Sequence, residues 1–236
     1  MNASFDDSIQ KPLTRVLAEI IVLWGVANVG YYTLIPALGF SISYDVSPIA
    51  NAIYFGFWVL FCAYYFKPIY SRWSTFEMPI WFYLALSLGL AGFLYALVYL
   101  FSLMPAVGGP SLAPYTDILL ATPWYFLPKA VEILLQQLLV AVLVLELFAR
   151  FHRVKTVIVG YILCFVGAHV LQFLVSDTPA PYAIVMTSGA FLSSFLFPYL
   201  MIRVKGGFVY SFMLHFLFYL LIAMLLHAFP PPGYVF

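Results

Sequence analysis

Seven long apolar stretches constrain this chain more than any other feature of its sequence. A helix that crosses the hydrocarbon core of a bilayer needs about 20 mainly apolar residues. By that criterion we expect membrane-spanning helices at Leu17–Gly39, Ile49–Phe66, Met78–Met104, Ile118–Ala149, Thr156–Val175, Tyr182–Ile202 and Phe208–Phe229. The chain is 65% hydrophobic and only 8% charged, whereas a soluble domain carries roughly a quarter charged residues. The sequence therefore predicts an all-α polytopic membrane protein with about seven transmembrane helices.

The fourth stretch is too long for one simple crossing of a bilayer. Pro123 and Pro128 lie in its first part, and proline removes a backbone donor and clashes with the preceding helical turn. We therefore expect the continuous helix to begin near Pro128, already at membrane depth. Because no polar segment between the stretches is long enough to fold alone, residues 1–236 are expected to form a single membrane-embedded domain.

Basic residues occur at alternate connections between the stretches. They lie before the first stretch and after the second, fourth and sixth: Lys11, Arg15, Lys67, Arg72, Arg150, Arg153, Lys155, Arg203 and Lys205. The remaining connections contain Asp45, Asp117 and Asp177 and no lysine or arginine. By the positive-inside rule the N-terminus is cytoplasmic and the C-terminus is outside. We expect a multi-pass integral membrane protein, and a bacterial inner membrane as its location.

Three ionisable side chains stand out inside the apolar stretches: Glu132, His169 and His215. Such groups are costly in hydrocarbon, so each is expected to face a partner or a wet cavity. A carboxylate beside two imidazoles could activate a water molecule or bind a divalent metal. The structural alternative stays open, because a membrane histidine often bonds a neighbouring helix and Glu132 could simply pair with Lys129, three residues earlier.

Two adjacent amides, Gln136 and Gln137, lie one helical turn from Glu132. Polar side chains need hydrogen-bond partners in lipid, so at least one of the two is expected to face the interior of the bundle. The ion pair expected at the inner boundary is Arg15 with Glu19, four residues later.

An ordered set of short motifs extends over about residues 123 to 225. Its parts are the segment Pro128 to Gln136, the basic loop Arg150 to Lys155, Phe165-Val166-Gly167-Ala168-His169, the turn Arg203 to Gly207 and the segment His215 to Tyr219. The order and spacing resemble the motifs Pro-x-x-Glu-Glu-x-x-x-Arg, Phe-x-x-x-His and His-x-x-x-Asn of the CPBP family. That family contains CAAX-processing proteases and bacteriocin-processing and immunity proteins. The resemblance implies a CAAX-protease-like helical bundle over residues 118–229. The three N-terminal spans, over residues 17–104, show no such resemblance.

This sequence departs from the family pattern at important positions. If Pro128 sets the register, Val131 replaces the family's first glutamate, which activates water. In the same register Gln136 replaces the arginine, and Tyr219 replaces the asparagine that helps to hold an oxyanion. A second register makes Glu132 the first glutamate and Gln137 the arginine position, which would retain the base. The two registers stay open at this point.

The resemblance implies a candidate catalytic set of Glu132, His169, His215 and Tyr219, supported by Lys129, Gln136, Gln137 and Phe165. Because the motifs are degenerate, we expect a non-catalytic accessory or assembly subunit of a membrane complex. The alternative is an active intramembrane endopeptidase, in which Glu132 and His169 activate water while His215 and Tyr219 stabilise the oxyanion.

A further alternative is a haem-binding membrane subunit that uses His169 and His215 as axial ligands. Otherwise no cofactor is expected, with a divalent metal at the Glu132 site left open. The formal net charge of +1 gives no indication of a nucleic-acid partner. The expected partners are the lipid bilayer and other membrane-protein chains.

Overall fold

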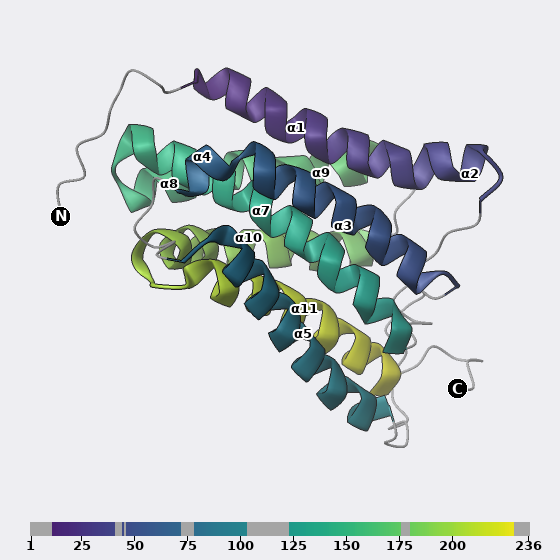
Figure 1. The fold of residues 1–236 in the computed structure, drawn as a ribbon. Coiled ribbons are helices and arrows are strands. Elements are labelled where there is room, and N and C mark those ends of the chain that lie inside the picture. Colours follow the sequence, from purple (N-terminus) through teal and green to yellow (C-terminus); the bar gives the residue numbers. More distant parts are fainter. Residues whose placement is uncertain are drawn as a thin grey trace.

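The computed structural model describes residues 11–40, 44, 46–71, 78–102, 123–175 and 180–228, and every regular element in these ranges is a helix. The first half contains α1 (Leu13–Val29), the π-helical turn η2 (Gly30–Leu34), α2 (Ile35–Ala37), α3 (Pro48–Tyr65), α4 (Lys67–Tyr70) and α5 (Ile80–Ser102). The second half contains the 3-10 turn η3 (Pro123–Tyr125), α7 (Phe126–Phe151), α8 (Val154–Tyr161), the π-helical turn η4 (Ile162–Val166), α9 (Gly167–Val175), α10 (Ala180–Arg203) and α11 (Gly207–Ala228). The long helices lie side by side in one bundle (Figure 1).

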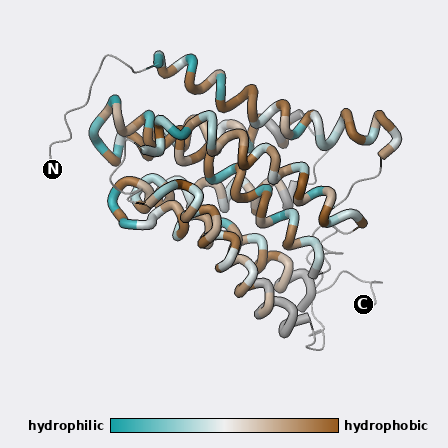
Figure 2. Tube along the Cα trace, viewed as in Figure 1, coloured by the Kyte–Doolittle hydropathy of each residue, from teal (hydrophilic) through white to brown (hydrophobic). Residues whose placement is uncertain are grey.

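Within the described residues, six helices are long and apolar enough to cross a membrane: Leu13–Ala37, Pro48–Tyr65, Phe126–Phe151, Val154–Leu171, Ala183–Arg203 and Gly207–Met224. Figure 2 shows apolar residues along the length of these helices. The predicted span Met78–Met104 corresponds to α5, a helix of 23 residues whose apolar segment in the searched residues is Ile80–Leu94. The fold is therefore all-helical, with the helices of a multi-pass integral membrane protein.

Helix α7 is the centre of the bundle. It packs against α1, α3, α5, α8, α10 and α11, and 83% of its membrane-spanning window is buried. For the spans formed by α1–α2 and by α8–α9 the buried share is only 11%. These two spans form the periphery, so most of their side chains are open to lipid or to another protein.

The start of α7 agrees with the predicted effect of the prolines. The helix begins at Phe126, and Pro128 lies in its first turn, where a missing N–H donor removes no helical hydrogen bond. Pro123 lies in the preceding 3-10 turn. The first residues of the predicted span, 118–122, lie outside the described residues.

Two of the spans expected to be continuous α-helices contain a π-helical turn. In the first, the Ile35 N–H donates to the Gly30 carbonyl five residues earlier. Pro36 follows directly, and a proline clashes with the carbonyl four residues before it, which a widened turn relieves. In the second, the Gly167 N–H donates to the Ile162 carbonyl, and no proline lies nearby.

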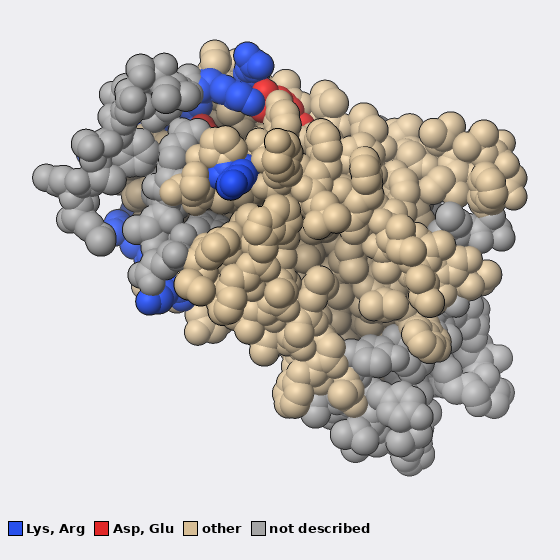
Figure 3. Space-filling model, viewed as in Figure 1, with Lys and Arg blue, Asp and Glu red and all other residues tan. Residues whose placement is uncertain are grey.

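The connections predicted to be basic lie together at one end of the bundle. The Lys11 ammonium lies 4.9 Å from the centroid of the Tyr65 ring at the end of α3, and Arg203 lies 5.9 Å from the Phe148 ring near the end of α7. Arg150 donates a hydrogen bond to the Lys11 carbonyl. Figure 3 shows blue lysine and arginine side chains gathered at this end of the visible face. The acidic residues predicted for the opposite end lie outside the described residues: Asp45, Asp117 and Asp177.

Candidate functional site

The Glu132 carboxylate is buried near the start of α7 and accepts three hydrogen bonds. Its Oε2 atom accepts from Lys129 Nζ at 2.8 Å and from the Tyr44 hydroxyl at 2.6 Å. Its Oε1 atom accepts from Gln136 Nε2 at 3.2 Å. Lys129 and Gln136 lie three and four residues from Glu132 and therefore share its helix face. The pairing of Glu132 with Lys129 that the spacing predicted is present in the structure.

Tyr44 is a residue that the sequence analysis missed. It lies between α2 and α3, 88 residues before Glu132, and its ring packs 5.1 Å from that of Tyr125 and 5.8 Å from that of Tyr31. Burial raises the pKa of Tyr44 well above its ordinary value, so the hydroxyl stays protonated and donates to the carboxylate. A tyrosine in a short turn shows no periodicity that would have indicated this contact.

The Lys129 ammonium has aromatic neighbours as well as its carboxylate partner. Its Nζ atom lies 4.2 Å from the centroid of the Tyr219 ring and 5.5 Å from that of the Tyr44 ring. A cation over an aromatic face is attracted by the negative charge of the ring's π-system. Tyr219 in turn stacks on His215, with the ring centroids 5.6 Å apart. Lys129 therefore links Glu132 to the residues of α11.

His215 is held by Gln137. The Gln137 Nε2 atom lies 2.9 Å from His215 Nδ1, and Gln137 is fully buried, which confirms that one of the two glutamines faces the interior. An amide nitrogen donates, so His215 Nδ1 accepts and its ring proton is on Nε2. In the described part of the chain the Gln137 Oε1 atom has no hydrogen-bond partner.

His169 lies on α9 and bonds its own helix. Its Nδ1 atom lies 2.9 Å from the Phe165 carbonyl oxygen, which belongs to the π-helical turn η4. A carbonyl can only accept, so Nδ1 carries the proton and Nε2 presents a lone pair. The Phe165 ring also packs 4.6 Å from the imidazole.

The structure thus joins most of the predicted site residues into one row between α7 and α11: Gln136, Glu132, Lys129, Tyr219, His215 and Gln137. His169, on α9, bonds its own helix instead. In the described residues no group of three or more His, Cys, Asp or Glu side chains is placed to hold a metal ion.

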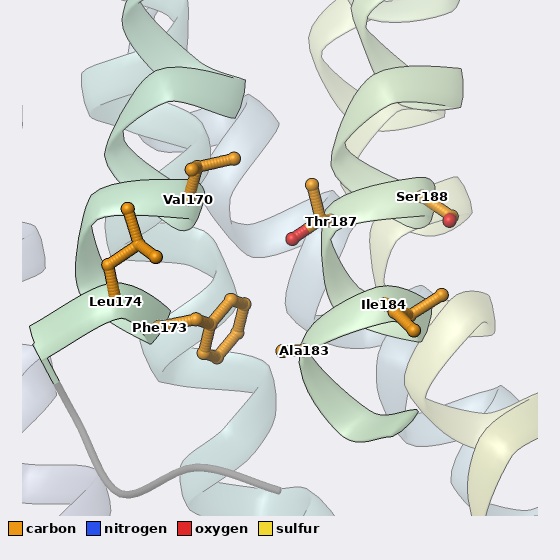
Figure 4. Close-up of a pocket in the computed structure, with 7 residues that line it drawn as sticks. All are labelled: Val170, Phe173, Leu174, Ala183, Ile184, Thr187 and Ser188. Atoms are coloured by element: carbon orange, nitrogen blue, oxygen red, sulfur yellow. The ribbon is translucent and has the colours of Figure 1, made fainter. Parts of the chain in front are cut away.

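A pocket of about 440 Å³ lies elsewhere, between α9 and α10. It is lined by apolar side chains and two hydroxyls: Val170, Phe173, Leu174, Ala183, Ile184, Thr187 and Ser188. Val170 and Phe173 project from α9 towards α10, and Thr187 points back across the gap (Figure 4). The predicted site residues do not line this pocket, so the row of polar side chains is not part of it.

A second polar cluster lies at the basic end of α7, and the sequence analysis missed its acidic member. Glu146 is only 4% exposed and accepts from Arg150 at 2.6 Å. The i, i+4 spacing of the pair was the indication that could have found it. Nearby, Lys11 and Arg15 bind Glu19 at 2.8 and 3.1 Å, which confirms the ion pair expected between Arg15 and Glu19. The hydrogen bond to Glu19 raises the pKa of Lys11.

Comparison of the chain with protein-family models, with curated proteins and with solved structures gave no match.

Proposed function

We propose that this protein is a CPBP-like integral membrane protein with a non-catalytic Glu/His/His site, and that it acts as an accessory or assembly subunit of a membrane complex. The observation that carries the proposal is the bonding of Glu132. A carboxylate can accept about four hydrogen bonds. Glu132 already accepts three from donors of the same chain. A general base must instead accept a hydrogen bond from the water that it activates.

The substituted motif positions support the same proposal. Gln136, at the arginine position of the proline register, donates to Glu132. Tyr219, at the asparagine position, presents its ring to Lys129. In the second register Gln137 takes the arginine position, and it bonds His215. In both registers the residues at the replaced positions make contacts within the chain.

The peripheral spans offer the surface that an assembly partner needs. Only 11% of the membrane-spanning residues in α1–α2 and in α8–α9 are buried. Large apolar side chains such as Ile21, Leu163 and Leu171 are well exposed. Helices associate in lipid through close packing and interhelical polar contacts. A partner helix that covers either span would gain this packing without disturbing α7.

The proposal includes seven spans in a bacterial inner membrane, with the N-terminus in the cytoplasm. What supports the orientation is the gathering of basic side chains at one end of the bundle. Single cysteines at Lys155 and at the exposed Val46, in a chain with Cys62 and Cys164 replaced by alanine, test it. A membrane-impermeant maleimide is expected to label the Val46 site in intact cells and the Lys155 site only after lysis. The reverse pattern would overturn the orientation.

The functional experiment is tagged purification in a mild detergent of the wild type and of Glu132→Gln and His169→Ala variants. An accessory subunit is expected to bring down partner chains in fixed stoichiometry, and each variant that folds should retain them. The His152→Ala variant, which alters a histidine outside the site, is the matched control. Recovery of a lone monomer from native membranes would contradict the proposal. Loss of cleavage of a co-expressed membrane peptide in folded Glu132→Gln protein would establish the endopeptidase alternative instead.

A further inference from the structure

The Lys129 ammonium is enclosed on three sides by groups that bind cations. Its Nζ atom is 2.8 Å from Glu132 Oε2, 4.2 Å from the Tyr219 ring centroid and 5.5 Å from the Tyr44 ring centroid. Proteins that recognise ammonium ligands commonly use aromatic faces of this kind. Here the ammonium belongs to the chain itself, and Lys129 is only 8% exposed.

Each of these three groups is held in place by contacts that do not involve the lysine. Glu132 is bonded by Gln136 and Tyr44. The Tyr44 ring packs against Tyr125 and Phe55.

Tyr219 is supported in the same independent way. Its ring stacks on His215, and His215 is bonded by Gln137. The three groups around the ammonium, Tyr44, Glu132 and Tyr219, also come from three separate parts of the fold. These are the turn before α3, helix α7 and helix α11. Removal of the lysine side chain would therefore leave the carboxylate and both rings in position.

We propose that Tyr44, Glu132 and Tyr219 form a binding site for a primary alkylammonium group, which the chain closes with its own Lys129. In the wild type the tethered ammonium competes at very high effective concentration, so free amines do not enter. Truncation of Lys129 to alanine removes three methylene groups and the ammonium. The group that fits the vacated space is n-propylammonium. This inference holds whether the protein is an accessory subunit or a peptidase.

The test is thermal unfolding of the full-length Lys129→Ala protein in detergent, with increasing n-propylammonium chloride. Propylammonium is expected to raise the unfolding temperature of this variant in a saturable manner and to leave the wild type unchanged. Sodium chloride at the same ionic strength and n-propanol, which has the same carbon chain and no charge, are the controls. In the Lys129→Ala background, Tyr219→Leu should weaken the apparent affinity about tenfold, whereas Tyr219→Phe, which keeps the aromatic face, should preserve it.

A second measurement decides the question if Lys129→Ala does not fold. With Lys129 present, Tyr219→Phe should unfold at a clearly higher temperature than Tyr219→Leu, and this difference should shrink when Lys129→Met removes the cation. Equal unfolding temperatures for the two Tyr219 variants, or equal protection of Lys129→Ala by propanol and propylammonium, would overturn the proposal.

Discussion

The buried pair of Lys129 and Glu132 makes a prediction whose size follows from the geometry. At 2.8 Å and an effective dielectric constant of about 20, the attraction between two unit charges is about 6 kcal/mol. Both residues are less than a tenth exposed, and withdrawing each ion from water costs several kcal/mol, so the attraction and the desolvation nearly cancel. The net contribution of the intact pair to the free energy of unfolding is therefore expected to be small.

Removal of one partner should be costly, because it leaves an uncompensated buried charge. We expect Glu132→Gln and Lys129→Met each to lower the free energy of unfolding by about 3–5 kcal/mol. The double variant should lie within about 1 kcal/mol of the wild type, since it contains no buried charge at this position. A glutamine at position 132 also keeps an oxygen that can accept from Tyr44.

Equilibrium unfolding in mixed detergent micelles, followed by tryptophan fluorescence, measures these differences. Arg15→Met provides a control, because the Arg15 side chain is 65% exposed and Lys11 still pairs with Glu19 in this variant. An ion pair made by an exposed side chain contributes at most about 1 kcal/mol. If the double variant loses as much stability as the two single variants together, the two side chains do not compensate each other's charge, and the prediction is wrong. Single variants as stable as the wild type would also refute it, and would indicate that water reaches Glu132, as a peptidase requires.

Substitutions at three further places test the local structure through the same unfolding measurement. A Cβ added at Gly207 would collide with the Leu200 carbonyl oxygen of α10, so Gly207→Ala should lower the free energy of unfolding by about 3 kcal/mol or more. Gly206→Ala meets no such contact and should cost only about 1 kcal/mol, because the alanine would take a φ of +70°. His152 follows the last residue of α7 and has a φ of 54°, which glycine adopts more easily than alanine. The His152→Gly variant should therefore be about 1 kcal/mol more stable than His152→Ala. Equal stability of the two variants would contradict backbone strain at this position. Arg150→Met removes the ion pair with Glu146 and the hydrogen bond to the Lys11 carbonyl. It should lower the free energy of unfolding by about 1.5–3 kcal/mol, and an unchanged stability would contradict a structural role for Arg150.

The positions of the helices were largely predictable from hydropathy. The spans predicted at Ile49–Phe66 and Phe208–Phe229 correspond to helices at Pro48–Tyr65 and Gly207–Ala228. The agreement has a physical reason: bilayer thickness sets the length of a span, and lipid forces its backbone to bond internally. The π-helical turns escaped prediction because one wider turn changes neither the length nor the apolarity of a span.

The site was predictable only where its contacts are local. The pairing of Glu132 with Lys129 follows from their spacing along one helix. The pairing of Glu146 with Arg150 could have been predicted in the same way. The bond from Tyr44 spans 88 residues and depends on how the turn before α3 is placed against α7. No periodic pattern encodes such a contact. Consequently the sequence identified the carboxylate but not the hydroxyl that completes its hydrogen bonding.

The two polar clusters of α7 explain how the N-terminal spans are fixed to the second half of the chain. Glu132 and Arg150 are separated by about 27 Å along the helix. Each cluster includes one group from the N-terminal part, namely the Tyr44 hydroxyl at Glu132 and the Lys11 carbonyl at Arg150. Lipid tails are as apolar as leucine, so hydrophobic burial alone does not fix how far one helix slides along another. Two polar attachments about 27 Å apart do fix it. A carboxylate that serves as one of these attachments has to keep its internal partners, which is why a structural role for Glu132 conflicts with a role as a free catalytic base.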